Sequence, residues 1–286
     1  MKNGINDGVL PPLVGNVITD QRHCIDNLFA DTWKKLKINV RIKRAGFTKR
    51  SGIDITEAVF LLLLWKWINV SSIAMFSRKA LRMFSRAKKD VMYDLLKRED
   101  VNWRLFNLQT AKGVYQQNTL GQSRIRAFVL DDTIKTRCGK KMEGVSSHFD
   151  HVTGRHVMGQ QVLTLGFATE EAFLPLDSQI YISGVKVREL IAEHKDSRSA
   201  LGKRYSEATT QSKPQMAANM IKRATRCGIE ADYVIADAWL GTKSMMRTAL
   251  GLEMCAILRM KKSKMKYRAV IKGRKKELLN AQELYT

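Results

Sequence analysis

The chain is poor in cysteine and proline, with four of each among 286 residues. Its cysteines are widely separated and show none of the paired spacing that zinc sites and redox motifs require: Cys24, Cys138, Cys227 and Cys255. A disulfide framework or a cysteine-based metal site is therefore not expected. We expect reduced thiols in a cytoplasmic protein.

Long hydrophobic runs are also missing. The most apolar run, Ala58 to Trp65, is followed at once by Lys66, and it is well short of the roughly 20 apolar residues that span a bilayer. No signal peptide is indicated either, because the apolar pair Val9-Leu10 is followed by two prolines. We expect no membrane association.

Acidic residues are few relative to basic ones. The chain holds 27 Asp and Glu against 50 Lys and Arg, which gives a net charge of +23. An imbalance of this size creates a positive surface potential that attracts polyanions. Nucleic acid is therefore the first partner to consider, and double-stranded DNA is the partner we expect.

Two stretches concentrate the basic residues. The stretch 32–53 holds eight and no acid, which indicates either a DNA-contacting arm or a solvated face. The stretch 259–276 holds ten and no acid, which suits a DNA-backbone groove or a disordered basic tail. The residues expected to bind DNA are Lys43, Arg44, Lys140, Lys141, Lys261, Lys262 and Lys264.

Hydrophobic periodicity predicts an α/β protein with a helical N-terminal region. One helix start is legible at Asp54, which can cap the run that follows. Strands are predicted near 126–130, 157–169, 172–182, 233–236 and 254–260, and helices near 216–227 and 242–250. The polar segment 195–213 is predicted to be a linker or insertion. Because helices separate only the later strands, we expect antiparallel strands first and a mixed sheet with helices on its faces.

Two apolar strands end in carboxylates, at Asp132 and at Asp237. If the first and fourth strands lie side by side, the two side chains meet and can hold Mg²⁺, which prefers hard oxygen ligands. Strand alternation favours Asp132 over Asp131, because Asp132 shares a face with Phe128 and Leu130. The alternative is that either aspartate caps a helix or forms a turn.

These motifs resemble the DDE transposases of the insertion-sequence-four group, whose catalytic core is ribonuclease-H-like. The resemblance covers roughly 126–268 and rests on Leu130-Asp131-Asp132-Thr133 with Lys135, Lys140 and Lys141, on Ser147 to Asp150 with His151 through His156, and on Ile235 to Gly241. It implies that Asp132 and Asp237 are catalytic and bind Mg²⁺ or Mn²⁺. It also implies cleavage and strand transfer at transposon ends by a prokaryotic, nucleoid-associated protein, with a homodimer in the synaptic complex.

The resemblance implies three regions. Residues 1–120 form a helical DNA-binding region, 121–262 an incomplete catalytic core, and 263–286 a basic tail at the start of a truncated insertion. The third acid of the family, a glutamate in a Tyr-Arg-Glu pattern, is not found after any of the seven tyrosines. The chain is therefore expected to be truncated. The alternatives are a non-catalytic DNA-binding fragment and a stand-alone ribonuclease-H-like nuclease.

Three histidines near the first strands are weaker candidates. His148, His151 and His156 have neither cysteine partners nor helical spacing. They are predicted to be polar loop or substrate-contact residues rather than zinc ligands. Glu277 and Glu283 are poor replacements for the third acid, because they lie in a polar tail soon after the last strand of the core.

Overall fold

A computed structural model describes the following residues of the chain: 31–48, 51–67, 71–138, 142, 144–150, 153–182, 196–260, 266–269, 277–280 and 282–284. The chain divides into two compact units. The first comprises Met1–Phe106 with His194–Lys203, and the second Asn107–Glu193 with Arg204–Thr286. Several residues singled out in the sequence lie outside the described ranges: Cys24, Lys140, Lys141, His151, Lys261, Lys262 and Lys264.

The first unit is helical, as the sequence predicts. Its helices are α3 (Ile38–Arg44), α4 (Ile55–Trp67), α5 (Ile73–Lys79), α6 (Leu81–Phe84), α7 (Asp90–Lys97) and the start of α8 (Trp103–Gln117). Helix α4 begins next to Asp54, whose Oδ1 accepts a hydrogen bond from the Thr56 amide at 2.7 Å, so the predicted start is confirmed. Within the described residues, no helix has the length and apolar character needed to cross a membrane.

The basic stretch 32–53 is not a detached arm over its described residues. Helix α3 buries Ile38 and Ile42, and Phe47 just beyond it is also buried. The Phe47 ring packs edge-on against Trp103, with ring centroids 4.7 Å apart. Lys43 and Arg44 are exposed on the outer side of α3. The stretch thus combines an apolar anchor with a basic outer surface.

The second unit contains a six-stranded mixed sheet. Its strands are β1 (Ala127–Thr136), β2 (Ser146–Asp150), β3 (Arg155–Ala168), β4 (Phe173–Tyr181), β5 (Tyr233–Ala236) and β6 (Cys255–Leu258). The order is β2-β3-β1-β5-β6, with β4 also paired to β3. Pairs among β1 to β4 are antiparallel, whereas β1–β5 and β5–β6 are parallel. This arrangement confirms the ribonuclease-H-like fold. A separate hairpin pairs β7 (Lys266–Ala269) with β8 (Glu277–Asn280).

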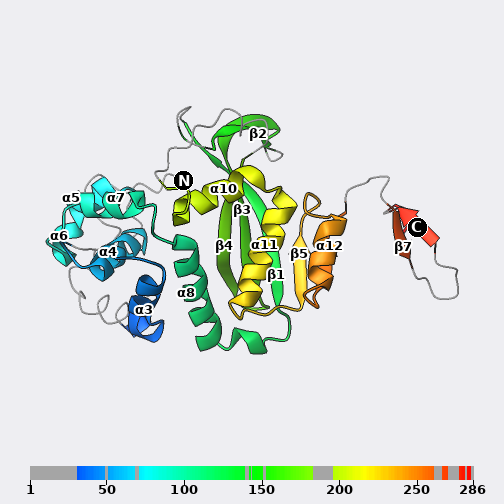
Figure 1. Cartoon of the computed structure of the whole chain (residues 1–286), viewed down its shortest axis with the longest axis horizontal. Coiled ribbons are helices and arrows are strands. Elements are labelled where there is room, and N and C mark those ends of the chain that lie inside the picture. Colours follow the sequence, from blue (N-terminus) through cyan, green and yellow to red (C-terminus); the bar gives the residue numbers. More distant parts are fainter. Residues whose placement is uncertain are drawn as a thin grey trace. The chain divides into compact units, whose positions relative to one another are not determined.

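Three helices pack against this sheet and form a hydrophobic core with it. Residues of α8, α11 (Lys213–Arg226) and α12 (Lys243–Leu250) share one buried cluster with the strands. Figure 1 shows α11 over β1 and β3, and α12 beside β5. Phe128, Leu130 and Val234 point into this cluster, whereas Ile235 and Ile257 on the opposite face are exposed. In the described residues the helices of this cluster therefore cover one face of the sheet.

Strand β2 and helix α10 were not predicted, and neither was the β7–β8 hairpin. Strand β2 is short and polar, and it forms because it pairs with the start of β3. Helix α10 (Ala200–Thr210) occupies the segment predicted to be a linker. Polar contacts hold α10 to β4: Gln179 Nε2 donates to the Arg204 carbonyl at 3.0 Å, and Arg204 Nη2 donates to the Ser178 carbonyl at 2.7 Å. Because contacts of this kind are polar, they give no hydrophobic periodicity from which the helix could be predicted.

An ion pair fixes the beginning of the parallel strand pair. Arg126, directly before β1, donates from Nε to Asp232, directly before β5, at 2.9 Å. This hydrogen bond lowers the pKa of Asp232 and raises the pKa of Arg126. The Arg126 carbonyl also accepts from the amides of Asp232 and Tyr233, at 2.8 and 3.1 Å. These contacts set the register in which β1 and β5 run side by side.

A second ion pair is buried under α11. Asp177 on β4 has a side chain only 2% exposed, and Arg223 on α11 donates to its Oδ2 from Nε at 3.0 Å and from Nη2 at 2.8 Å. A buried carboxylate is costly without a partner, so the pair fixes α11 against β4.

We expect Arg223→Met to lower the free energy of unfolding by about 3–5 kcal/mol, because it leaves the buried Asp177 carboxylate without its cation. Urea denaturation followed by circular dichroism measures the change. Arg198→Met is the matched control, since Arg198 pairs with Asp196 at the surface, where the change should stay under about 1 kcal/mol. Equal losses in the two variants would contradict this role for the buried pair.

Candidate functional site

Asp132 and Asp237 lie just beyond the residues through which β1 and β5 pair in parallel. The last pair of β1 and β5 joins Leu130 to Ala236. Asp131 and Asp132 come next along β1, and Asp237 directly follows β5. Because the carboxyl ends of parallel strands meet at one edge of a sheet, the predicted neighbourhood of the two strands is confirmed.

Asp132 faces the helices, and Asp131 faces the other way. Along β1 the side chains alternate, so Asp132 continues the face of Phe128 and Leu130. Asp131 is exposed, and its Oδ1 accepts from the amide of Asp132 at 2.8 Å. The Asp132 side chain is 25% exposed, and its Oδ2 lies 2.6 Å from Nζ of Lys213. Asp132 is thus the aspartate of the pair that lies beneath α11.

Lys213 is the functional candidate that the sequence interpretation missed. It lies in the first turn of α11, and its side chain is only 3% exposed. Its Nζ is 4.6 Å from the ring centroid of Trp239 and 5.1 Å from that of Tyr181. A signal was present in the sequence: counting back from Met216 and Met220 by helical spacing places Lys213 on the buried stripe.

Asp237 shapes the loop that leaves β5. Its Oδ1 accepts from the amides of Trp239 and Leu240, at 3.1 and 3.3 Å. This is the turn-forming role that the sequence left open for a strand-end aspartate. The loop ends at Gly241, where an added Cβ would lie 2.3 Å from the Arg259 carbonyl oxygen. Asp237 and Trp239 are therefore held by a loop that touches the backbone just beyond β6.

The charges of Asp132 and Lys213 both influence the pKa of His148. Burial is the main cause that lowers the pKa of His148, and the positive charge of Lys213 lowers it further, whereas a backbone hydrogen bond and Asp132 act in the opposite direction. Its Nε2 is 2.9 Å from Ser146 Oγ. His148 lies on strand β2, although a loop position was expected. His156 is on β3, with its Nδ1 3.4 Å from Ser147 Oγ.

The donor set at this edge suits a hard divalent cation. Asp132 and Asp237 offer carboxylate oxygens from adjacent parallel strands, which are the ligands that Mg²⁺ and Mn²⁺ prefer. The ammonium group already bound to Asp132 indicates that this carboxylate is stabilised by positive charge. In the part of the chain that is described, no group of three or more His, Cys, Asp or Glu side chains is placed to hold a metal ion.

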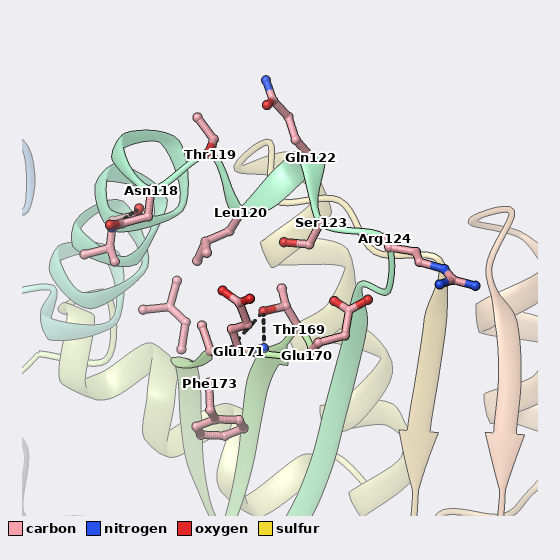
Figure 2. Close-up of a pocket in the computed structure, with 13 residues that line it drawn as sticks. Asn118, Thr119, Leu120, Gln122, Ser123, Arg124, Thr169, Glu170, Glu171 and Phe173 are labelled. Atoms are coloured by element: carbon pink, nitrogen blue, oxygen red, sulfur yellow. Dashed lines mark hydrogen bonds between the residues drawn. The ribbon is translucent and has the colours of Figure 1, made fainter.

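A cavity of about 770 Å³ lies at the opposite end of the sheet. It is lined by residues that precede β1, among them Ser123 and Arg124, and by the turn between β3 and β4. Figure 2 shows Glu170 and Glu171 facing Leu120 and Ser123 across this space. Since Asp132 lies beyond the middle of β1, the cavity is separate from the edge that carries the aspartates.

The first unit has a concave surface of about 480 Å³, which we call the basic hollow. Four cations and one acid line it, together with the small residues Ala74, Ser77 and Ala87. All five charged residues are exposed: Arg78, Arg82, Lys88, Lys89 and Asp90. A concave surface with this charge suits the phosphates of a nucleic acid backbone.

Comparison with families of known proteins gives one match, described as "DDE superfamily endonuclease", over residues 72–276. No curated protein matches the chain.

Three solved structures are similar to the chain at low identity. The Drosophila P element transposase strand transfer complex is 9% identical, with a TM-score of 0.33, over 84% of this chain and 44% of that chain. The piggyBac transposase synaptic complex with hairpin DNA is 12% identical, with a TM-score of 0.32, over 87% and 50%. The Mos1 strand transfer complex is 11% identical, with a TM-score of 0.22, over 76% and 63%. The chain thus spans less than two thirds of each of these proteins.

We expect Gly241→Ala to lower the free energy of unfolding by about 1–3 kcal/mol, because the new Cβ would force the loop away from the Arg259 carbonyl. Urea denaturation measures the loss. Gly251→Ala is the control, since its Cβ would meet nothing closer than 3.2 Å. Similar stability of the two variants would contradict the close approach of the loop.

Proposed function

Because the chain belongs to the DDE superfamily endonucleases, we propose that it is a transposase of the insertion-sequence-four group that cleaves and rejoins DNA at transposon ends. The observation that carries this proposal is the parallel pairing of β1 with β5, which brings Asp132 and Asp237 to one edge of a ribonuclease-H-like sheet. Two carboxylates at that edge offer the oxygen ligands that a divalent ion for phosphoryl transfer prefers.

In this proposal Asp132 and Asp237 hold Mg²⁺ or Mn²⁺. Bound there, the metal would supply Lewis-acid stabilisation for attack on a phosphodiester and for the departing oxygen. The residues of the chain do the positioning. Strand β1 fixes Asp132 beneath α11, and the backbone amides of Trp239 and Leu240 orient the Asp237 carboxylate.

DNA is the proposed substrate and partner, and the helical N-terminal region 1–120 is its proposed binding region. Lys43 and Arg44 on α3 contribute exposed positive charge. The basic hollow adds four cations around a concave surface. The charge of the whole chain, +23, supports association with a polyanion before any specific contact forms. A homodimer in a synaptic complex is part of the same proposal.

We expect the combined variant Arg82→Gln, Lys88→Gln and Lys89→Gln to flatten the salt dependence of DNA binding. Each lost phosphate contact removes about 0.9 from the slope of log K against log salt, so the slope should fall by up to about 3. Fluorescence anisotropy with labelled duplex DNA at several salt concentrations measures the slope. The control neutralises three exposed cations of α11 and α12, namely Lys222, Arg226 and Arg247. Equal effects would show that the basic hollow is not a preferred contact.

We expect Asp132→Asn and Asp237→Asn each to reduce metal-dependent nicking of transposon-end DNA by at least about a hundredfold, because each removes a charged ligand. DNA binding should change little, since neither aspartate neutralises a phosphate. Gel assays with Mg²⁺ or Mn²⁺ measure nicking, and anisotropy measures binding.

The rival function is DNA binding without catalysis, which is favoured by the lack of a third acidic ligand beside Asp132 and Asp237 among the described residues. DNA binding by the wild-type chain with no metal-dependent nicking would support this rival. Nicking that survives in both aspartate variants would overturn the assignment of the two catalytic residues.

A further inference from the structure

We propose that Lys213 is a built-in counter-cation of the catalytic edge, which neutralises Asp132 in the metal-free protein and competes with the divalent ion for that carboxylate. The proposal rests on the proposed function in one respect, the role of Asp132 as a metal ligand. It assigns to Lys213 a positioning role that acts through Asp132.

The location of Lys213 is unfavourable for a cation. Its side chain is 3% exposed, so the ammonium group has lost most of its hydration. It also lies in the first turn of α11, where the partial positive charge of the helix end repels cations. A compensating interaction is therefore required, and the Asp132 oxygen at 2.6 Å provides it.

Two aromatic rings complete the surroundings of the ammonium group. Trp239 lies 4.6 Å away and Tyr181 5.1 Å away, both within the range of cation–π attraction. Trp239 belongs to the loop that Asp237 orients. Lys213 thus contacts the strand that carries one aspartate and the loop that carries the other.

This position creates competition between two cations. A divalent ion at Asp132 would lie within a few ångströms of a fixed ammonium group in a poorly hydrated pocket, where like charges repel strongly. The ion must either share Asp132 with Lys213 or displace it. In both cases the positive charge of Lys213 weakens metal binding, so removing that charge should strengthen it.

Calorimetric titration of the full chain with Mn²⁺ tests the proposal without reference to catalysis. We expect Lys213→Met to bind Mn²⁺ at least about tenfold more tightly than the wild-type chain, because the competing charge is gone and Met can still fill the space between the rings. Lys213→Gln should show the same gain in Mn²⁺ affinity, because it also removes the positive charge. Its amide can still donate a hydrogen bond to Asp132. Lys213→Arg should bind as weakly as the wild-type chain.

Lys222→Met is the matched control. Lys222 lies on the same helix and is exposed, and its substitution changes the net charge by the same amount. The Mn²⁺ affinity should therefore change by less than about twofold. If Lys222→Met gained as much Mn²⁺ affinity as Lys213→Met, the effect would come from the net charge of the chain, and the proposal would be overturned.

Asp132→Asn separates this proposal from the proposed function. If Asp132→Asn weakens Mn²⁺ binding while Lys213→Met and Lys213→Gln leave it unchanged or weaker, the metal site stands and the competition is wrong. If Asp132→Asn leaves Mn²⁺ binding unchanged, the metal-ligand role of Asp132 is wrong, and the proposal for Lys213 falls with it. A gain in Lys213→Met that disappears in the double variant with Asp132→Asn supports both.

Discussion

The parallel pairing of β1 with β5 is the constraint on which the rest of the second unit depends. Two strands far apart in the sequence can run parallel only if the chain between them crosses back over the sheet. Here α10 and α11 lie in that connection, and α11 shares one buried apolar cluster with Phe128, Leu130 and Val234. The ion pair between Arg126 and Asp232 fixes the start of the pairing. The register that results places Asp132 and Asp237 just beyond the last paired residues of the two strands.

The same pairing gathers negative charge at one edge, and the chain treats each carboxylate differently. Asp132, beneath α11, is neutralised by the ammonium group of Lys213. Asp237, at the loop, is oriented by two backbone amides. Asp177, which is almost fully buried, has a guanidinium partner. The two carboxylates that are shielded from solvent thus each have a cationic partner, as the cost of desolvation requires.

The sequence predicted those parts of the fold that are apolar and periodic. Strand β5, helix α12 and the antiparallel set built on β3 were confirmed because their hydrophobic residues follow strand or helix spacing. The adjacency of β1, which carries Asp132, and β5, which Asp237 follows, was predicted from the order of elements. Helix α10 was missed because polar contacts with distant residues determine its position, and such contacts leave no hydrophobic period. Lys213 was missed because the helix was predicted to begin at Met216, although helical spacing places Lys213 on its buried stripe.

Lys213 departs from the local rules in two respects. It places a cation on the buried stripe of α11 and at the positive end of that helix, whereas no other described lysine or arginine is buried. Replacing a buried ion pair by apolar residues of similar volume is often neutral or stabilising, by about 1–4 kcal/mol. Packing alone therefore gives no reason for a lysine here. The proposed metal-ligand role of Asp132 does give one, because a charged and partly buried Asp132 needs a cationic partner when no metal is bound.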